Sequence, residues 1–92
     1  MKPVVYILQS LKNERYYIGS TQDIETRLKE HNGGLVKATR HLAPLELKTI
    51  ISCETIVEAR KAEYRLKKYK SRRIIDKVIK DSSLPWQYKT GL

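Results

Sequence analysis

The chain has 92 residues and a single cysteine, which indicates one small domain without an internal disulfide, as expected in a reducing compartment. Its longest uninterrupted apolar run, "VVYIL", is too short for a membrane span or for the core of a signal peptide, so we expect a cytoplasmic protein. Nineteen Lys and Arg residues against ten Asp and Glu residues give a formal charge of +9.

The positive charge is concentrated in the last third of the chain. Residues 1–59 carry eight basic and seven acidic side chains, a net charge of +1, whereas residues 60–92 carry eleven and three, a net charge of +8. Such a distribution favours a polyanionic partner, most simply nucleic acid. The alternative is a solvated basic helix face, as many small basic proteins have.

The first half of the chain predicts two strands and a helix. Residues 2–10 have a strand composition that is apolar on both faces, which predicts a central strand. Residues 15–21 predict a second strand, joined to the first by a polar turn into a hairpin. Residues 23–32 have apolar side chains at helical spacing and precede two glycines that are typical of a helix end.

The second half predicts one strand and two helices. A loop over residues 35–44 leads to a third strand over residues 45–52. Thr55 and Glu58 have the spacing of a capping box, which predicts a helix from Ile56 to about Lys70. Ser71 can cap a further helix over residues 72–81, and residues 82–92 predict an irregular tail. The order ββαβαα predicts an α+β fold, with a small three-stranded, mainly antiparallel sheet and flanking helices in one domain over residues 1–81.

One helix carries a carboxylate where a core residue is expected. Its predicted inward stripe consists of Ile56, Ala59, Ala62, Leu66 and Tyr69. Glu63 lies in the middle of that stripe, although burial deprives a carboxylate of its hydration. Glu63 therefore either pairs with a base such as Lys67, or faces a wet pocket and holds a divalent cation.

Other polar groups collect near the predicted hairpin. Arg27 and His31 are four residues apart, so they project from one face of their helix. Tyr6 and Tyr17 stand in the two strands, where each one alone is most simply a core residue with a hydrogen-bonded hydroxyl. Gly19 predicts a bulge, or a place where a ligand or another backbone approaches closely.

In their order along the chain, these residues resemble the GIY-YIG endonuclease family. "VVY", residues 4–6, keeps the tyrosine of the first motif, and "YIG", residues 17–19, matches the second. Arg27 and His31 follow in "RLKEH", and Glu63 follows in "EARKAEYRLKK". The match spans nearly the whole domain. In size the chain resembles the small stand-alone bacterial members, similar to the nuclease module of the bacterial excision-repair incision enzyme.

The resemblance implies a metal-dependent endonuclease that hydrolyses phosphodiester bonds in DNA. It implies one Mg²⁺ or Mn²⁺ ion held by Glu63, and Arg27 bound to the scissile phosphate. Tyr6 or Tyr17 would be the general base, and His31 would orient or deprotonate Tyr6. The expected catalytic residues are thus Tyr6, Tyr17, Arg27, His31 and Glu63.

The expected nucleic-acid contacts come from Arg27 and from the basic last third of the chain. In that last third they are Lys67, Lys68, Lys70, Arg72, Arg73 and Lys77. We expect no separate DNA-recognition domain and little sequence specificity, so that the structure of the DNA or a protein partner would direct cleavage. Several relatives have a supporting asparagine after the glutamate, whereas Asn13 and Asn32 both precede Glu63. The second hypothesis is accordingly a catalytically weak or inert module that binds DNA or RNA with the same fold.

Overall fold

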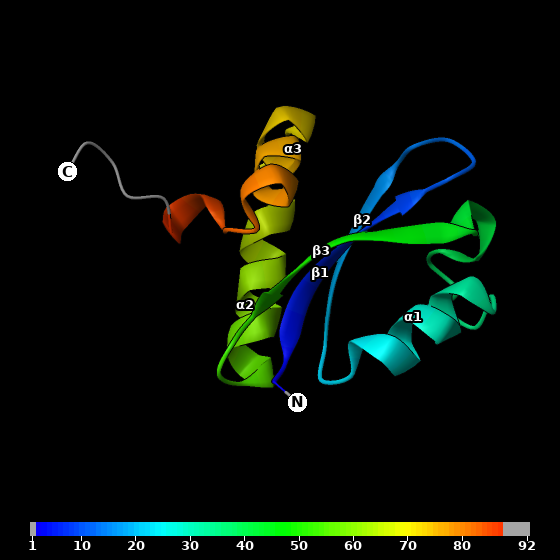
Figure 1. Ribbon diagram of the computed structural model, residues 1–92, viewed down its shortest axis with the longest axis horizontal. Coiled ribbons are helices and arrows are strands. Elements are labelled where there is room, and N and C mark those ends of the chain that lie inside the picture. The colour runs from blue at the N-terminus through cyan, green and yellow to red at the C-terminus, as the bar shows by residue number, and fades with distance from the viewer. Residues whose placement is uncertain (1, 88–92) are drawn as a thin grey trace.

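The computed structural model describes residues 2–87, and its elements follow the predicted order (Figure 1). The strands are β1 (Val4–Ser10), β2 (Tyr16–Thr21) and β3 (Leu45–Ser52). The helices are α1 (Ile24–Asn32), α2 (Ile56–Lys67) and α3 (Arg72–Asp81), with short 3₁₀ turns at Arg40–Leu42 and Pro85–Gln87. The predicted α+β class with a three-stranded antiparallel sheet is confirmed. In the described part of the chain, no helix has the length and apolar character needed to cross a membrane.

β1 is the central strand, as its apolar character on both faces predicts. The strand order is β2-β1-β3, and both pairings are antiparallel. Val5 and Ile7 point toward α2 and α3, whereas Tyr6 and Leu8 point toward α1. In Figure 1, α1 lies on one side of the sheet and α2 and α3 lie on the other, so both faces are covered. The free edges of the sheet are therefore β2 and β3.

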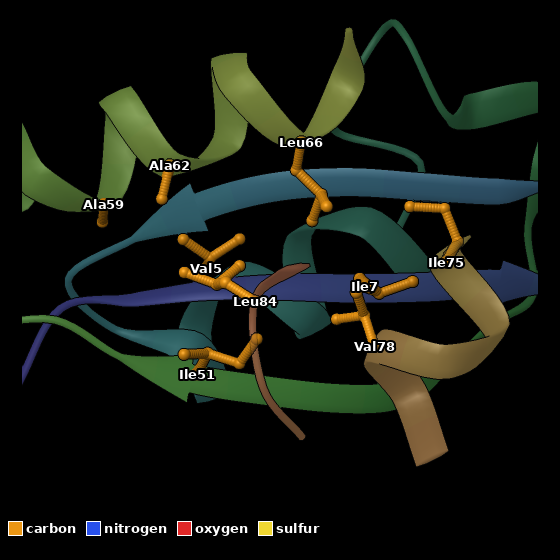
Figure 2. Packing of buried hydrophobic residues seen from close by; sticks show 9 residues of the cluster. All are labelled: Val5, Ile7, Ile51, Ala59, Ala62, Leu66, Ile75, Val78 and Leu84. Carbon is orange, nitrogen blue, oxygen red and sulfur yellow. The ribbon is translucent and has the colours of Figure 1, made fainter. Parts of the chain in front are cut away.

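The larger core cluster lies between the sheet and the two C-terminal helices. Figure 2 shows Val5, Ile7 and Ile51 of the sheet facing side chains of α2 and α3. The helical side of this cluster is formed by Ala59, Ala62, Leu66, Ile75 and Val78. Leu84 completes the cluster and brings residues 82–87 against the domain, within the segment predicted to be irregular. Residues 88–92 of that segment lie outside the described residues.

The two long C-terminal helices begin with the predicted caps. The Thr55 side chain accepts a hydrogen bond from the Glu58 backbone N–H at 3.1 Å. The Glu58 carboxylate in turn accepts from the backbone N–H of Glu54. The Ser71 hydroxyl accepts from the Ile74 N–H at 3.3 Å and starts α3. The bonds that Thr55 and Ser71 accept satisfy N–H groups that a helix start leaves without partners.

α2 ends earlier than its sequence predicts. The helix stops at Lys67, and Lys70 adopts a positive φ of 47°, which turns the chain toward α3. The prediction that Tyr69 lies on the inward stripe is wrong, because Tyr69 is 38% exposed. Its ring instead stacks on Trp86, with centroids 6.5 Å apart. The inward stripe of α2 therefore ends at Leu66, which is fully buried.

The loop between α1 and β3 is held against the sheet by polar contacts, some partly and some fully buried. The Asn32 side chain exchanges hydrogen bonds with the backbone N–H and C=O of Leu45, at 2.7 and 3.1 Å. The Ser10 hydroxyl donates to the Leu42 carbonyl at 2.7 Å. Thr39, between these anchors, is fully buried. A loop that the sequence leaves without regular structure is thus fixed where it can contact α1.

Candidate active site

A pocket of about 360 Å³ opens at the free edge of the sheet formed by β2. It is lined by residues of β1, β2, α1 and α2, namely Tyr6, Tyr17, Gly19, Ser20, Arg27, Arg60 and Glu63. Four of the five predicted catalytic residues therefore share one pocket. The fifth, His31, is fully buried and lies behind Tyr6, with which it shares a hydrogen bond.

The two walls of the pocket belong to opposite faces of the sheet. Tyr17 packs with Tyr6 on the face that α1 covers. Ser20 is paired in register with Val5, whose side chain lies on the face that α2 covers. The edge of β2 thus brings Arg27 of α1 and Glu63 of α2 to the same pocket, although they approach from different sides.

Gly19 makes room for the phenol of Tyr6. The two residues are directly paired between β1 and β2. A Cβ atom at Gly19 would lie 2.9 Å from Cε2 of Tyr6 and still closer to the hydroxyl end of the ring, which is an overlap. The predicted close approach at Gly19 is therefore made by a side chain of the neighbouring strand. The register shift in the sheet lies elsewhere, between Ile7 and Leu8.

Tyr6 and His31 form the buried back wall of the site. The Tyr6 Oη lies 2.8 Å from Nε2 of His31, and Nδ1 of His31 lies 2.7 Å from Oγ1 of Thr39. Burial raises the pKa of Tyr6 to about 12, although Arg27 acts in the opposite direction. Burial, followed by the charge of Arg27, lowers the pKa of His31 below its ordinary value. Both side chains are therefore neutral at pH 7. The ring of Tyr17 packs edge-on against His31, with centroids 5.1 Å apart.

Arg27 lies between the phenol and solvent. Its side chain is about one-third exposed, at 36%, and Nη1 donates to Oε1 of Glu30 at 3.1 Å. The phenol of Tyr6 and then the Glu30 carboxylate raise the pKa of Arg27, so the guanidinium stays charged. A charged fork that lines an open pocket has the geometry to bind two oxygens of a phosphate group.

Glu63 pairs with Lys67, as the first of its two predicted roles requires, and it also lines the pocket, whereas the predicted divalent cation stays a prediction. Its side chain is 22% exposed and lines the pocket, while Oε2 accepts a hydrogen bond from Nζ of Lys67 at 2.6 Å. The other oxygen, Oε1, accepts from Oγ of Ser20 at 2.5 Å. Within residues 2–87, no three His, Cys, Asp or Glu side chains are grouped so as to hold a metal ion. A partly exposed carboxylate is still a suitable donor for a hard cation that retains most of its water.

Sequence reasoning missed two residues of the pocket, Ser20 and Arg60. Ser20 directly follows the "YIG" motif, and the strand period places it on the opposite face from Gly19. Arg60 precedes Glu63 by three residues, so the helical period places the two side chains on one face of α2. Both spacings were available from the sequence once Glu63 was assigned to a pocket.

A second, basic hollow adjoins the pocket. It has a volume of about 280 Å³ and is lined by Arg15, Tyr16, Ile18, Leu66, Lys67, Lys70, Ser71, Arg72 and Ile75. Lys67 joins the two hollows, because it also pairs with Glu63 and its Nζ lies 5.7 Å from the Tyr17 ring centroid. We refer to this second site as the basic hollow.

The predicted nucleic-acid contacts are divided between the two hollows and the outer surface. Arg27 lines the pocket, and the basic hollow contains Lys67, Lys70 and Arg72. The other three, Lys68, Arg73 and Lys77, are exposed but do not line either hollow. Arg15 of the hairpin also lines the basic hollow. It was not predicted as a nucleic-acid contact, because the first 59 residues have a net charge of only +1.

A family model of the GIY-YIG catalytic domain matches residues 2–75. The chain belongs to the GIY-YIG family. Similar proteins include a UPF0213 protein of Halobacterium salinarum, which is 38% identical over 68% of this chain and 82% of the relative. A UPF0213 protein of Clostridium perfringens is 42% identical over 70% of this chain and 69% of the relative.

A solved structure supports the same assignment. The solution NMR structure of a UPF0213 protein from Bacillus halodurans covers all of this chain and 97% of that protein, with 32% identity and a TM-score of 0.54. Within the GIY-YIG family the chain thus resembles small proteins of about its own length. GIY-YIG is a nuclease family whose substrates are nucleic acids, so the family predicted from Tyr6, "YIG", Arg27, His31 and Glu63 is confirmed.

Proposed function

We propose that this GIY-YIG protein is a metal-dependent endonuclease that hydrolyses phosphodiester bonds in DNA. The observation that carries the proposal is the pocket at the edge of β2, which unites Arg27, Tyr6, Tyr17 and Glu63. Cleavage has little sequence specificity, because the basic hollow offers contacts to the phosphate backbone of the DNA and not to its bases. The structure of the DNA or a protein partner directs where cleavage occurs.

The phosphate is held from both sides of the pocket. Arg27 binds nonbridging oxygens of the scissile phosphate through its planar fork. Arg60 lies on the α2 side of the same pocket and provides a second positive charge. Because negative charge grows on the phosphoryl oxygens during attack, preorganised cations around them stabilise the transition state more than the ground state.

Tyr6 receives the proton of the attacking water. Its hydroxyl has an acceptor, Nε2 of His31, whereas the Tyr17 hydroxyl makes no hydrogen bond with any residue from 2 to 87. A free phenolate is scarce at pH 7 when the pKa is about 12, so the two transfers are concerted. As the water oxygen bonds to phosphorus, its proton moves to Tyr6 Oη, and the former Tyr6 proton moves to His31 Nε2. The bond between phosphorus and the leaving sugar oxygen breaks in the same step, and that oxygen takes a proton from solvent water.

Glu63 is the residue that would hold the Mg²⁺ or Mn²⁺ ion. Such an ion, when bound, supplies Lewis-acid stabilisation of the phosphoryl charge. Magnesium commonly uses one or two protein carboxylates and keeps several waters, which fits a single glutamate. Ser20 fixes one oxygen of Glu63 and thereby has the supporting role for which relatives use an asparagine. Lys67, on the other oxygen, neutralises the carboxylate when no other cation is bound.

The bound strand continues from the pocket into the basic hollow. Lys67, Lys70 and Arg72 line that hollow, and Lys67 links it to Glu63. Lys68, Arg73 and Lys77 add exposed charge on the surface of the same helical region. The arrangement supports phosphate contacts on one side of the scissile bond. Such contacts strengthen binding without reading base sequence.

The alternative function, a weakly active or inert nucleic-acid-binding module, also has an observation in its favour. Both carboxylate oxygens of Glu63 already accept hydrogen bonds, from Ser20 and Lys67. If a divalent ion does not displace the Lys67 ammonium, the protein binds DNA or RNA through its cations and does not cleave it.

Glu63→Gln separates these two functions. We expect the substitution to abolish nicking of supercoiled plasmid and branched DNA in Mg²⁺ or Mn²⁺, and to abolish any rise in melting temperature on adding the metal. DNA binding without metal should persist, because a negative charge near the phosphates is lost. The apo protein should lose little stability, because a solvent-accessible i,i+4 ion pair contributes about 0.3–0.5 kcal/mol.

Asp81→Asn is the matched control for Glu63→Gln. Asp81 also pairs with a lysine four residues away on a helix, Lys77, but lies in α3 outside the pocket. We expect it to nick at the wild-type rate per folded molecule. Wild-type nicking by Glu63→Gln would refute the assigned metal ligand. Binding without nicking by the wild-type protein in either metal would favour the alternative function.

A further inference from the structure

A buried chain of hydrogen bonds runs from the loop after α1 to the pocket. It begins at Thr39, whose Oγ1 lies 2.7 Å from Nδ1 of His31, and continues from Nε2 of His31 to Oη of Tyr6 at 2.8 Å. The relative accessibilities of Thr39 and His31 are both 0%, so water does not compete for these contacts. The chemical state of the imidazole is therefore set by its two protein partners.

A neutral imidazole has one N–H donor and one acceptor nitrogen, so its partners choose the tautomer. The Thr39 hydroxyl also lies 3.5 Å from the Val36 carbonyl, which can only accept. When the Thr39 hydroxyl donates its hydrogen to the Val36 carbonyl, its oxygen accepts a hydrogen bond from the Nδ1–H of His31. Nε2 of His31 then carries no hydrogen and can accept one. On the other side, Arg27 is a pure donor beside the Tyr6 oxygen, which favours a Tyr6 hydrogen directed at Nε2. The Thr39 end and the Tyr6 end of this series of hydrogen bonds thus both favour the His31 tautomer with hydrogen on Nδ1.

We infer that Thr39 is a positioning residue that holds His31 in the Nδ1–H tautomer, so that Nε2 can take the proton of Tyr6. In that transfer the Oη–H bond of Tyr6 breaks and the Nε2–H bond of His31 forms. The proton from water replaces it on Oη, so Tyr6 ends neutral and His31 becomes an imidazolium. Both N–H groups of the imidazolium then have acceptors, Thr39 Oγ1 and Tyr6 Oη. In the other tautomer Nε2 already carries hydrogen and cannot accept.

The tautomer can be measured without any substrate or metal. In protein labelled with ¹⁵N at histidine, the ring nitrogen shifts at pH 7 should show hydrogen on Nδ1 of His31. Thr39→Val keeps the β-branched shape but removes the acceptor, so His31 should change to the Nε2–H form. Thr39→Ser keeps a hydroxyl and should retain the wild-type form. A wild-type His31 with hydrogen on Nε2, or one whose tautomer does not change in Thr39→Val, would overturn the inference.

The activity measurement rests on the proposed endonuclease function. Loss of the partner that orients a metal-ligating histidine typically costs about 10–100-fold, and we expect nicking per folded molecule to fall by a similar factor in Thr39→Val. Thr39→Ser should restore it to within a few-fold of wild type. In a His31→Ala background, Thr39→Val should have no further effect, because the residue acts through His31. An additive loss there would mean a purely structural role and contradict the inference.

The two measurements fail in different ways. A protein that shows the Nδ1–H tautomer but never nicks DNA would contradict the proposed function and leave the tautomer assignment correct. A protein that nicks with His31 in the Nε2–H form would contradict the role of Thr39 and leave the nuclease function intact. If Thr39→Val does not fold, Thr39→Ala, which also removes the hydroxyl, takes its place, and a wild-type His31 in the Nε2–H form would still overturn the inference.

Discussion

Arg27 lies between two oxygen acceptors, the Glu30 carboxylate, to which it donates a hydrogen bond, and the neutral phenol of Tyr6. The guanidinium stays accessible to a ligand, because its side chain remains about one-third exposed beside the pocket. We therefore expect Arg27→Ala to reduce single-turnover nicking by about 10²–10³-fold, the usual effect of removing one preorganised donor. DNA affinity should change little, since one cation among many is lost.

Two further variants identify what Arg27 contributes. Arg27→Lys keeps the charge but not the planar fork, so it should recover only part of the rate. Glu30→Gln removes the ion-pair partner and leaves the guanidinium, and it should retain wild-type turnover. Nicking by Arg27→Ala at the wild-type rate would show that the Arg27–Glu30 pair is only structural.

Gly19 is required by packing, not by backbone conformation. Its missing Cβ is the space that the Tyr6 ring occupies. We expect Gly19→Ala to destabilise the protein by about 1–3 kcal/mol, as overpacking of a tight contact does, and to move Tyr6 away from His31. Gly33→Ala is a matched control, because its Cβ would meet only ordinary or slightly tight contacts at the end of α1. Thermal melting curves of both variants test this prediction. Equal losses of stability in Gly19→Ala and Gly33→Ala would contradict it.

At the scale of elements, the sequence predicts most of what depends on local pattern. The two apolar faces of residues 4–10 identify the central strand, and the caps at Thr55 and Ser71 are formed as predicted. The end of α2 could not be predicted, because the turn at Lys70 uses a positive φ without a glycine to mark it. Thr39 could not be predicted either, since its burial depends on how a loop without periodicity packs against α1.

The arrangement of α2 and α3 also decides which cations are useful. Lys70 and Arg72 line the basic hollow beside the pocket, whereas Arg73 and Lys77 lie outside it. Changing either pair to glutamate lowers the formal charge by the same amount. We expect Lys70→Glu with Arg72→Glu to weaken DNA binding more than Arg73→Glu with Lys77→Glu. The slope of log affinity against log salt should become shallower by about 1.8 in the first pair, for two lost phosphate contacts.

Filter binding or fluorescence anisotropy at several salt concentrations measures this difference. Melting curves should accompany it, because Arg72 also donates to the Glu14 carbonyl and lies over the Tyr16 ring. Equal losses of affinity in two folded double variants would mean that total charge, and not the basic hollow, sets binding.

For the whole molecule, a neutral histidine at the centre of the fold links stability to pH. His31 is fully buried between Tyr6, Tyr17, Thr39 and the charge of Arg27. Its pKa in the folded state is lower than in the unfolded state, where it is about 6.5. Between those two values the unfolded chain binds more protons, so the free energy of unfolding should fall as pH drops below about 6.5. It should level off below the folded-state pKa.

Urea denaturation at a series of pH values between about 7.5 and 5.5 tests this linkage. His31→Asn should be less stable than wild type at pH 7.5, because Tyr6 and Thr39 lose their buried partner. Its stability should nevertheless depend less on pH, since the proton-binding group is gone; one proton accounts for a slope of at most about 1.4 kcal/mol per pH unit. His41→Asn is the matched control, because His41 is exposed on the loop that also carries Thr39. Removal of His41 should leave the wild-type slope. If His31→Asn shows the same pH dependence as wild type while His41→Asn does not, the acid sensitivity does not come from the buried imidazole. The assignment of a neutral His31, which the proton transfer from Tyr6 requires, would then be wrong.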